Sequence, residues 1–202
     1  MIEVKGLNKC FGEKTLFKDF HLQIGKGEFV IITGESGSGK TTLLNMIGAL
    51  EQPDQGEILV EGINIVLKKN RLKYFRDTVG FLFQNFVLLE EKTVLYNLKL
   101  MKRNRVDEGL IDDALSKVGL TDKKNSVVFT LSGGEQQRVA LARLMLKECK
   151  LILADEPTGS LDEKNSHRVM DILKEMNRNG VTIIFVTHNH NLIEEGMRHI
   201  VL

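Results

Sequence analysis

The stretch from Phe29 to Leu44 constrains the fold of this chain most strongly. Residues 30–33 form a β-branched apolar run that stops at Gly34. A helical pattern of apolar residues begins after Lys40. The stretch therefore predicts a strand, a loop and a helix in direct succession.

The loop between this strand and this helix has the spacing GxxxxGK[ST], in which glycines let backbone N–H groups turn toward phosphates. Lys40 is expected to reach the outer phosphates and Thr41 to bind Mg²⁺. The N-terminal end of the helix adds positive potential at the same point. A glycine-rich turn with a surface lysine is the alternative, but the strand and helix context favours nucleotide binding. The residues expected to surround the phosphates are Gly34, Glu35, Ser36, Gly37, Ser38, Gly39, Lys40, Thr41 and Thr42.

Length and composition indicate one globular domain. A chain of 202 residues buries roughly 70% of the surface that it exposes when unfolded. Its 28 Lys and Arg residues nearly balance 27 Asp and Glu residues, so we expect no nucleic-acid partner. Cys10 and Cys149 follow no metal-ligand spacing and are expected to be reduced thiols in a cytosolic protein. The apolar runs are strand-sized and no signal peptide is recognised, so any membrane span is expected in a partner.

A β-rich region is predicted around the loop. Residues 2–7 and 17–24 alternate apolar and polar side chains, and residues 57–60 and 63–67 flank a Glu-Gly turn. Phe11 lies in a predicted loop between the first two strands. Its ring could stack on an adenine, although an isolated Phe is more often a core residue.

A helical insert is predicted after the strand at residues 79–84. That strand ends at Gln84, whose amide could reach a metal ion or make an ordinary loop hydrogen bond. From Thr93 to about Gly119, apolar residues recur at helical spacing.

Another helix is predicted to begin within the run LSGGEQQR. Ser132 and Glu135 have the spacing of a capping box. Gly133 and Gly134, between them, leave the first helical N–H groups open to an anion. The alternative is an ordinary helix start with no ligand.

Charged side chains follow two later strands. Asp155 and Glu156 end a buried strand, where ligands bind in open α/β sheets. Burying two adjacent carboxylates there costs free energy unless they bind a cation or exchange a proton. His188 follows the next strand on the same predicted sheet edge as Gly34, and by itself is as often structural as functional.

In combination these motifs make the chain resemble the ATP-binding subunit of an ABC transporter over residues 2–202. LSGGE is the most specific of them, because such a run rarely arises by chance at average composition. Phe11 stands where a tyrosine is usual, which keeps the stacking face and removes the hydroxyl. Cys149 stands where the family often has proline. The matching segments are Gly34–Thr42 (Walker A), Gln84 (Q-loop), Leu131–Arg138 (signature), Leu151–Glu156 (Walker B), Ser160–Asp162 (D-loop) and His188 (switch histidine).

The resemblance implies an α/β fold: a P-loop NTPase (RecA-like) core with an N-terminal antiparallel β subdomain and an inserted α-helical subdomain. We expect a single domain over residues 1–202. In it, residues 1–84 and 150–202 would form the β subdomain and the P-loop core. Residues of about 85–149 would form the helical subdomain with the signature motif.

The resemblance also implies a homodimer in which two copies pair head to tail. Each ATP then lies between Walker A of one copy and the signature of the other. Besides Walker A, the implied nucleotide contacts are Phe11, Ser132, Gly133, Gly134, Glu135 and Asp162. The implied Mg²⁺ ligands are Thr41, Gln84 and Asp155. The implied catalytic residues are Lys40, Glu156, which polarises the attacking water, and His188, which contacts the γ-phosphate.

The implied function is to energise a membrane transporter by ATP hydrolysis. An integral membrane permease would hold the chain on the inner face of the cell membrane, docking at about residues 85–130. Residues 154–162 resemble the MacB and LolD branch, and residues 80–89 resemble bacteriocin-export ATPases, so export of a peptide, lipoprotein or drug-like substrate is expected.

Two alternatives remain open. The ATPase could act as a switch, either FtsE-like on a membrane complex or as a soluble factor. Soluble ABC proteins usually carry two cassettes or a coiled-coil insert, and neither is present here. A GTPase or kinase with the same P-loop would leave LSGGE unexplained.

Overall fold

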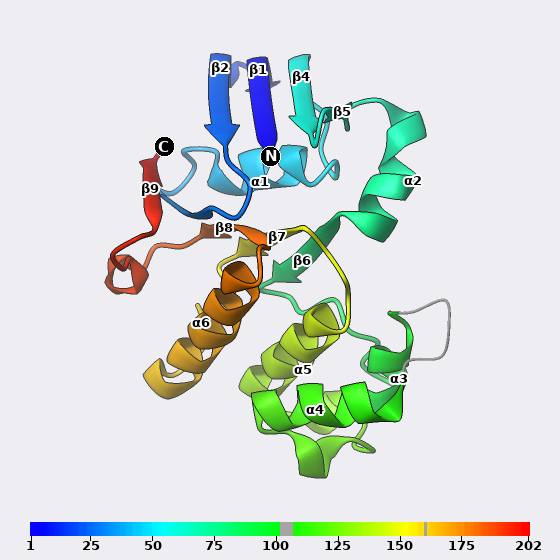
Figure 1. Ribbon diagram of the computed structural model, residues 1–202. Helices are drawn as coiled ribbons and strands as arrows, with labels where there is room; N and C mark the ends of the chain where they lie inside the picture. Colours follow the sequence, from blue (N-terminus) through cyan, green and yellow to red (C-terminus); the bar gives the residue numbers. More distant parts are fainter. Residues whose placement is uncertain (102–106, 160) are drawn as a thin grey trace.

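Two β-sheets form the frame of the molecule (Figure 1). The computed structural model describes residues 1–101, 107–159 and 161–202. In this part of the chain, an antiparallel sheet has the strand order β2-β1-β4-β5, and a parallel sheet has the order β6-β7-β8-β3-β9. The strands are β1 (Ile2–Phe11), β2 (Lys14–Ile24), β3 (Phe29–Thr33), β4 (Gln55–Val60), β5 (Ile63–Asn64), β6 (Val79–Phe83), β7 (Leu151–Asp155), β8 (Thr182–Val186) and β9 (Arg198–Val201).

The parallel sheet is covered on both faces, which explains its continuous apolar strands. In β3, Val30 and Ile32 pack in the cluster that contains α1 (Lys40–Ile47) and the antiparallel sheet. The alternate residue Ile31 packs in the cluster that contains α5 (Gly133–Met145) and α6 (Glu163–Arg178). Figure 1 shows α1 between the two sheets and α5 and α6 below the parallel one. The period of two in strand side chains therefore divides the core into two layers.

The helices follow the sequence-based expectations in type and differ at some ends. Besides α1 they are α2 (Lys68–Asp77), α3 (Val94–Lys99), α4 (Glu108–Val118), α5 (Gly133–Met145) and α6 (Glu163–Arg178). The predicted helical pattern from Thr93 to Gly119 includes residues 102–106, which lie outside the described residues. Helices α3, α4 and α5 fall within residues 85–149, and the subdomain boundary itself stays a prediction.

Several sequence-based boundaries were wrong. Strands β1 and β2 extend beyond the predicted residues 2–7 and 17–24, and β5 ends at Asn64 rather than at residue 67. Phe11, expected in a loop, ends β1, because β1 and β2 continue their pairing to the register Phe11↔Lys14. Its side chain is 52% exposed, so the core alternative for Phe11 is also wrong. Apolar residues at helical spacing predict a helix from about Ser166 to Asn177. Helix α6 instead begins at Glu163, because Asp162 caps it.

The central strand β8 offers a test of this core. Phe185 is fully buried, and replacing it by Ala would leave a cavity between the sheet and its covering helices. We expect Phe185→Ala to lower the free energy of unfolding by about 3–5 kcal/mol. Urea denaturation followed by circular dichroism measures this change. The matched control is Phe129→Ala, since the Phe129 side chain is 65% exposed. An equal loss in both variants would contradict the assignment of Phe185 to the core.

Candidate active site

The loop between β3 and α1 requires glycine at two positions. Gly34 has a φ of 149°, and a Cβ there would collide with the carbonyl oxygen of Leu202. Gly39 has a φ of 105°, and a Cβ there would lie 2.8 Å from the Phe17 ring. The loop therefore keeps this backbone path only with glycine at both positions. Among the described residues no side chain caps α1 at Gly39, so its first N–H groups remain available to an anion.

Lys40 is held inside this loop by its backbone. The side chain is only 6% exposed, and its Nζ donates to the carbonyl oxygens of Gly34 at 2.9 Å and Glu35 at 2.8 Å. A buried ammonium group is stable only when acceptors surround it. The loop therefore holds the positive charge of Lys40 close to its own backbone N–H groups.

The carboxylate of Asp155 lies opposite this charge. Thr41 Oγ1 donates to Asp155 Oδ1 at 3.3 Å. Burial raises the pKa of Asp155, and the Thr41 hydrogen bond and the charge of Lys40 offset part of that rise. An ionised carboxylate in this position is incompletely compensated and would be stabilised by a cation.

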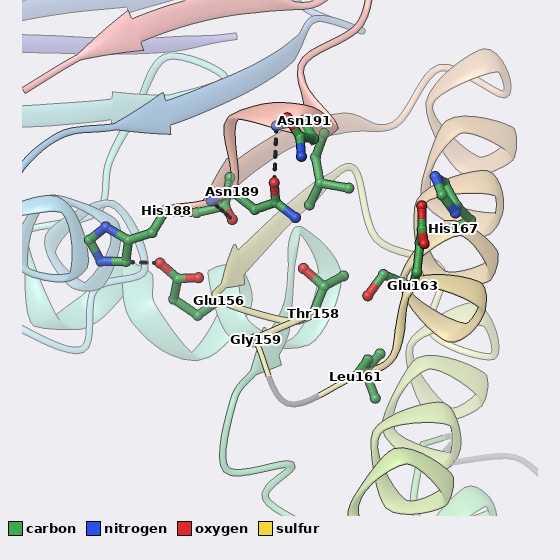
Figure 2. Close-up of a pocket in the computed structure, with 12 residues that line it drawn as sticks. Glu156, Thr158, Gly159, Leu161, Glu163, His167, His188, Asn189 and Asn191 are labelled. Carbon is green, nitrogen blue, oxygen red and sulfur yellow. Dashed lines mark hydrogen bonds and ion pairs between the residues drawn. The ribbon is translucent and has the colours of Figure 1, made fainter.

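Glu156 has a backbone conformation that is uncommon for a side chain of its size. Its φ is 46°, in the left-handed region, and such residues are often found at functional sites. His188 Nε2 lies 3.4 Å from Glu156 Oε1. Figure 2 marks this contact with a dashed line. Burial raises the pKa of Glu156, and His188 lowers it in part. A raised pKa suits a carboxylate that accepts a proton near neutral pH.

Three cavities meet at this edge of the parallel sheet. The first lies against the P-loop and is lined by Phe11, Lys14, Leu16, Ser36, Gly37, Gly39, Lys40, Thr41, Thr42, Glu156, Val186 and His188. The second contains the predicted metal ligands and is lined by Thr41, Asn45, Leu50, Phe83, Gln84, Asn85, Val87 and Asp155. The third, of about 730 Å³, lies on the other side of Glu156 and His188 and extends to Glu163 and His167 (Figure 2). Glu156 and His188 therefore separate two cavities.

The predicted Mg²⁺ ligands form a set of oxygen donors. The hydroxyl of Thr41, the amide of Gln84 and the carboxylate of Asp155 line one cavity. Oxygen donors with a single carboxylate suit Mg²⁺ bound together with phosphates. The incompletely compensated charge of Asp155 agrees with such an ion. The donor set therefore fits the metal that the sequence predicts.

The signature residues lie away from this edge. The capping box is present: Ser132 Oγ accepts from Glu135 N at 3.3 Å, and Glu135 Oε2 accepts from Ser132 N at 2.8 Å. Ser132, an implied nucleotide contact, thus also caps its own helix with its hydroxyl. Within the part of the chain that the structure describes, none of Ser132, Gly133, Gly134 and Glu135 lines the P-loop cavity.

Asp162 is tied to the signature helix rather than to the P-loop. Its Oδ1 accepts from Asn165 N at 2.8 Å and its Oδ2 from Asn165 Nδ2 at 2.7 Å. These bonds lower the pKa of Asp162. Asn165 Oδ1 in turn accepts from Arg138 Nη1 at 2.6 Å. Ser160, the first residue of the predicted D-loop, lies outside the described residues.

The sequence reasoning missed Lys14 and Leu16 as cavity residues. Lys14 Nζ donates to the carbonyl oxygen of Gly37 at 3.0 Å, so a second cation lies beside the P-loop. A lysine near a hairpin turn has no spacing that distinguishes it from a solvated one. Only the pairing of β1 with β2 brings it to the loop.

Fold and site together define a P-loop nucleoside-triphosphate hydrolase, with a phosphate-binding loop after β3 and paired carboxyl groups at the end of β7. A family model described as ABC transporter matches residues 17–159. The chain therefore belongs to the ABC transporter family and is an ATP-binding, ATP-hydrolysing domain.

Relatives with several different roles are similar to this chain. The lipoprotein-releasing system ATP-binding protein LolD of Aquifex aeolicus is 40% identical over 96% of this chain and 90% of its own length. The cell division ATP-binding protein FtsE of Mycobacterium tuberculosis is 38% identical over 91% of this chain and 82% of its own. The methionine import ATP-binding protein MetN of Legionella pneumophila is 40% identical over 96% of this chain, which spans 59% of the length of MetN.

Solved structures confirm the predicted fold class. The dimeric structure of MJ0796, a bacterial ABC transporter cassette, has a TM-score of 0.91 and 38% identity, over 100% of this chain and 94% of that one. A dimeric post-hydrolysis state of MJ0796 bound to ADP and Pi has a TM-score of 0.90 and 37% identity at the same coverage. In the described ranges of the present chain, no helix has both the length and the apolarity to cross a membrane.

The buried charge of Asp155 leads to a stability prediction. Because burial raises the pKa of this carboxyl group, the folded ligand-free protein loses stability as the pH rises from the usual aspartate pKa through the raised value. We expect Asp155→Asn to raise the melting temperature of the ligand-free protein at pH 7 by about 2–4 °C. The gain should shrink as the pH falls toward the usual aspartate pKa.

Differential scanning calorimetry between pH 4 and pH 7 measures this effect. The exposed residue Asp113 on α4 supplies the control variant Asp113→Asn, which should show no comparable gain. A lower melting temperature of Asp155→Asn at pH 7 would contradict the interpretation.

Proposed function

We propose that this chain is the subunit that supplies a membrane transport complex with the energy of ATP hydrolysis. In this proposal it lies on the cytoplasmic face of the membrane, bound to an integral membrane permease. The main support is that Lys40, Asp155, Glu156 and His188 converge at one sheet edge in a chain of the ABC transporter family.

Nucleotide binding is proposed to use the P-loop and β1. The N–H groups of residues 34–42 would surround the phosphates, and Lys40 would exchange its carbonyl partners for phosphate oxygens. Phe11, half-exposed beside the same cavity, would stack on the base. Burial of Lys40 supports this role because it limits competition from water.

Thr41, Gln84 and Asp155 are proposed to hold Mg²⁺. When bound, the ion neutralises negative charge on the β- and γ-phosphates. The fit of this oxygen donor set and the incompletely compensated charge of Asp155 support the assignment.

Hydrolysis is proposed to depend on Glu156 and His188. Glu156 would accept a hydrogen bond from the attacking water, orient it and take its proton. The raised pKa of its carboxyl group supports this role. His188, at 3.4 Å from that carboxylate, would contact the γ-phosphate and help to keep Glu156 in position.

A complete site is proposed to need two copies of the chain. The signature residues lie outside the P-loop cavity of their own protomer, so their helix start is free to meet a nucleotide bound by a second copy. Ser132 to Glu135 would then bind the γ-phosphate from the opposite side, and Asp162 would link the two sites. The dimeric arrangement of MJ0796 supports this proposal.

The permease is proposed to dock on the helical segment at about residues 85–130. Large apolar side chains exposed to solvent are frequent in this segment, and such exposure is typical of a surface that a partner covers. They are Val87, Leu89, Tyr96, Leu100, Leu110 and Phe129.

The proposed cargo is a peptide, a lipoprotein or a drug-like molecule that leaves the cytoplasm or the membrane. Similarity to LolD, a protein of a lipoprotein-releasing system, supports extrusion, and the resemblance of residues 80–89 to bacteriocin exporters suggests a peptide. A second candidate is a switch on a membrane complex without transport, which similarity to the cell division protein FtsE favours. Reconstitution with the permease in vesicles separates them, because only a transporter moves a substrate as ATP is consumed.

Replacing the proposed base tests the catalytic assignment. A positioned base contributes about 10²–10⁴ in rate, so Glu156→Gln should lower kcat by that factor and retain ATP binding. Since hydrolysis would then no longer open the dimer, ATP should trap a dimer on size-exclusion chromatography. Phosphate release measures the rate. Glu175→Gln, on the outer surface of α6, is the control and should hydrolyse ATP normally. Near-normal turnover by Glu156→Gln would refute the proposal.

A charge in the proposed docking segment tests the membrane partner. Leu100 is 49% exposed, and Leu100→Glu should move much of the protein from the membrane fraction of its host to the soluble fraction. Hydrolysis by the purified protein should not change. Ile63→Glu, an exposed apolar position on β5, is the matched control. If both variants stay with the membrane, the docking surface lies elsewhere.

A further inference from the structure

Lys9 is a buried cation that the proposed chemistry does not use. Only 6% of it is exposed, although it lies near the end of β1. Lys9 and Phe11 are two residues apart, and the Nζ of Lys9 lies over the Phe11 ring at 4.9 Å from its centroid. This distance is within the range of a cation–π interaction.

The ammonium group of Lys9 is fixed by the segment that follows the P-loop helix. Its Nζ donates to Glu51 Oε1 at 2.6 Å and to the carbonyl oxygen of Gln52 at 2.8 Å. Asp54 Oδ1 lies 3.6 Å away. The hydrogen bond with Glu51 raises the pKa of Lys9, against the effect of burial. The group is therefore a charged, immobilised cation.

The same segment also holds the backbone beside Phe11. Asp54 Oδ2 accepts from the N–H of Cys10 at 2.7 Å, and the N–H of Asp54 donates to the carbonyl oxygen of Asn8 at 2.9 Å. Both the backbone before Phe11 and the cation over its ring are thus attached to the connection between α1 and β4.

Phe11 needs such support because it cannot orient itself by hydrogen bonding. Its side chain has no polar atom and is 52% exposed beside the P-loop cavity. A cation over one face of the ring leaves the opposite face for another group. It also withdraws electron density from the ring, which favours stacking with an electron-rich purine.

We infer that Lys9 is a positioning residue for the nucleotide base: fixed by Glu51, Gln52 and Asp54, it holds the Phe11 ring with one face covered and the other available to the base. The inference rests on the proposed role of Phe11 in ATP binding. Through it, the segment that follows the P-loop helix supports the base.

The test compares two ligands that share phosphates and differ in the base. Isothermal titration with Mg²⁺ measures the affinity of the wild-type protein and the variants for ATP and for inorganic tripolyphosphate. Lys9→Met should weaken ATP binding about three- to tenfold and leave tripolyphosphate binding unchanged. Lys9→Arg, which keeps a cation, should restore most of the ATP affinity. Lys5→Met is the matched control, because Lys5 is an exposed lysine of the same strand that pairs with Glu3.

A double-mutant cycle tests whether Lys9 acts through Phe11. In a Phe11→Leu background, Lys9→Met should change ATP affinity by less than about twofold. If Lys9→Met does not fold, as its thermal melt would reveal, Glu51→Gln replaces it, because it weakens the hold on the ammonium group and should lower ATP affinity in the same selective way.

Three results would overturn the inference. They are unchanged ATP affinity in Lys9→Met, equal losses for ATP and tripolyphosphate, and a full loss that persists in the Phe11→Leu background. Failure of the proposed function looks different: wild-type protein would then bind neither ATP nor tripolyphosphate. If wild type binds ATP and Phe11→Leu binds it equally well, the role of Lys9 is refuted while the ATPase proposal stands.

Discussion

The parallel pairing of β3, β7 and β8 is the constraint on which the rest of the structure depends. The carboxyl ends of parallel strands lie at the same edge of the sheet. The pairing of the strands therefore brings the residues that follow them close together. Gly34, Glu156 and His188 all reach the site in this way. The pairing is stabilised by apolar burial on both faces of the sheet, with α1 on one side and α5 and α6 on the other. The geometry of a polar site is therefore set by the packing of an apolar core.

The protein itself compensates the charges of the site only in part. Lys40 is satisfied by loop carbonyls, while Asp155 has the Thr41 hydroxyl as its hydrogen-bond donor, and burial disfavours the ionised forms of both Asp155 and Glu156. Burying partly compensated charges lowers the stability of the fold, and proteins often lose stability in this way where residues serve a function. The proposed ligands would offset the cost, because Mg²⁺ and phosphates supply the charges that the protein leaves unpaired. The same residues that lower the stability of the fold would thus strengthen binding.

The sequence predicts best what local patterns determine. The P-loop, the buried strands and the capping box at Ser132 depend on residues within a few positions of one another, and all are present in the structure. The left-handed backbone of Glu156 could not be predicted, because it depends on how β7 ends against its neighbours. The support of Phe11 joins Lys9 to Glu51, 42 positions away, and no periodicity marks such a pair. The cap at Asp162 was missed although it is local: an Asp three residues before Asn165 is a helix-start pattern.

The hydrogen bonds around Asn165 have a mechanical consequence. This one amide joins Arg138, in the middle of α5, to Asp162, at the start of α6. A tilt of α5 caused by a partner on the helical segment would pull on Asp162. Arg138 and Asn165 both belong to helices, and the hydrogen bonds that connect them with each other and with Asp162 are short. Helix α5 and the start of α6 would then shift together, because the Asn165 amide is bonded to both of them.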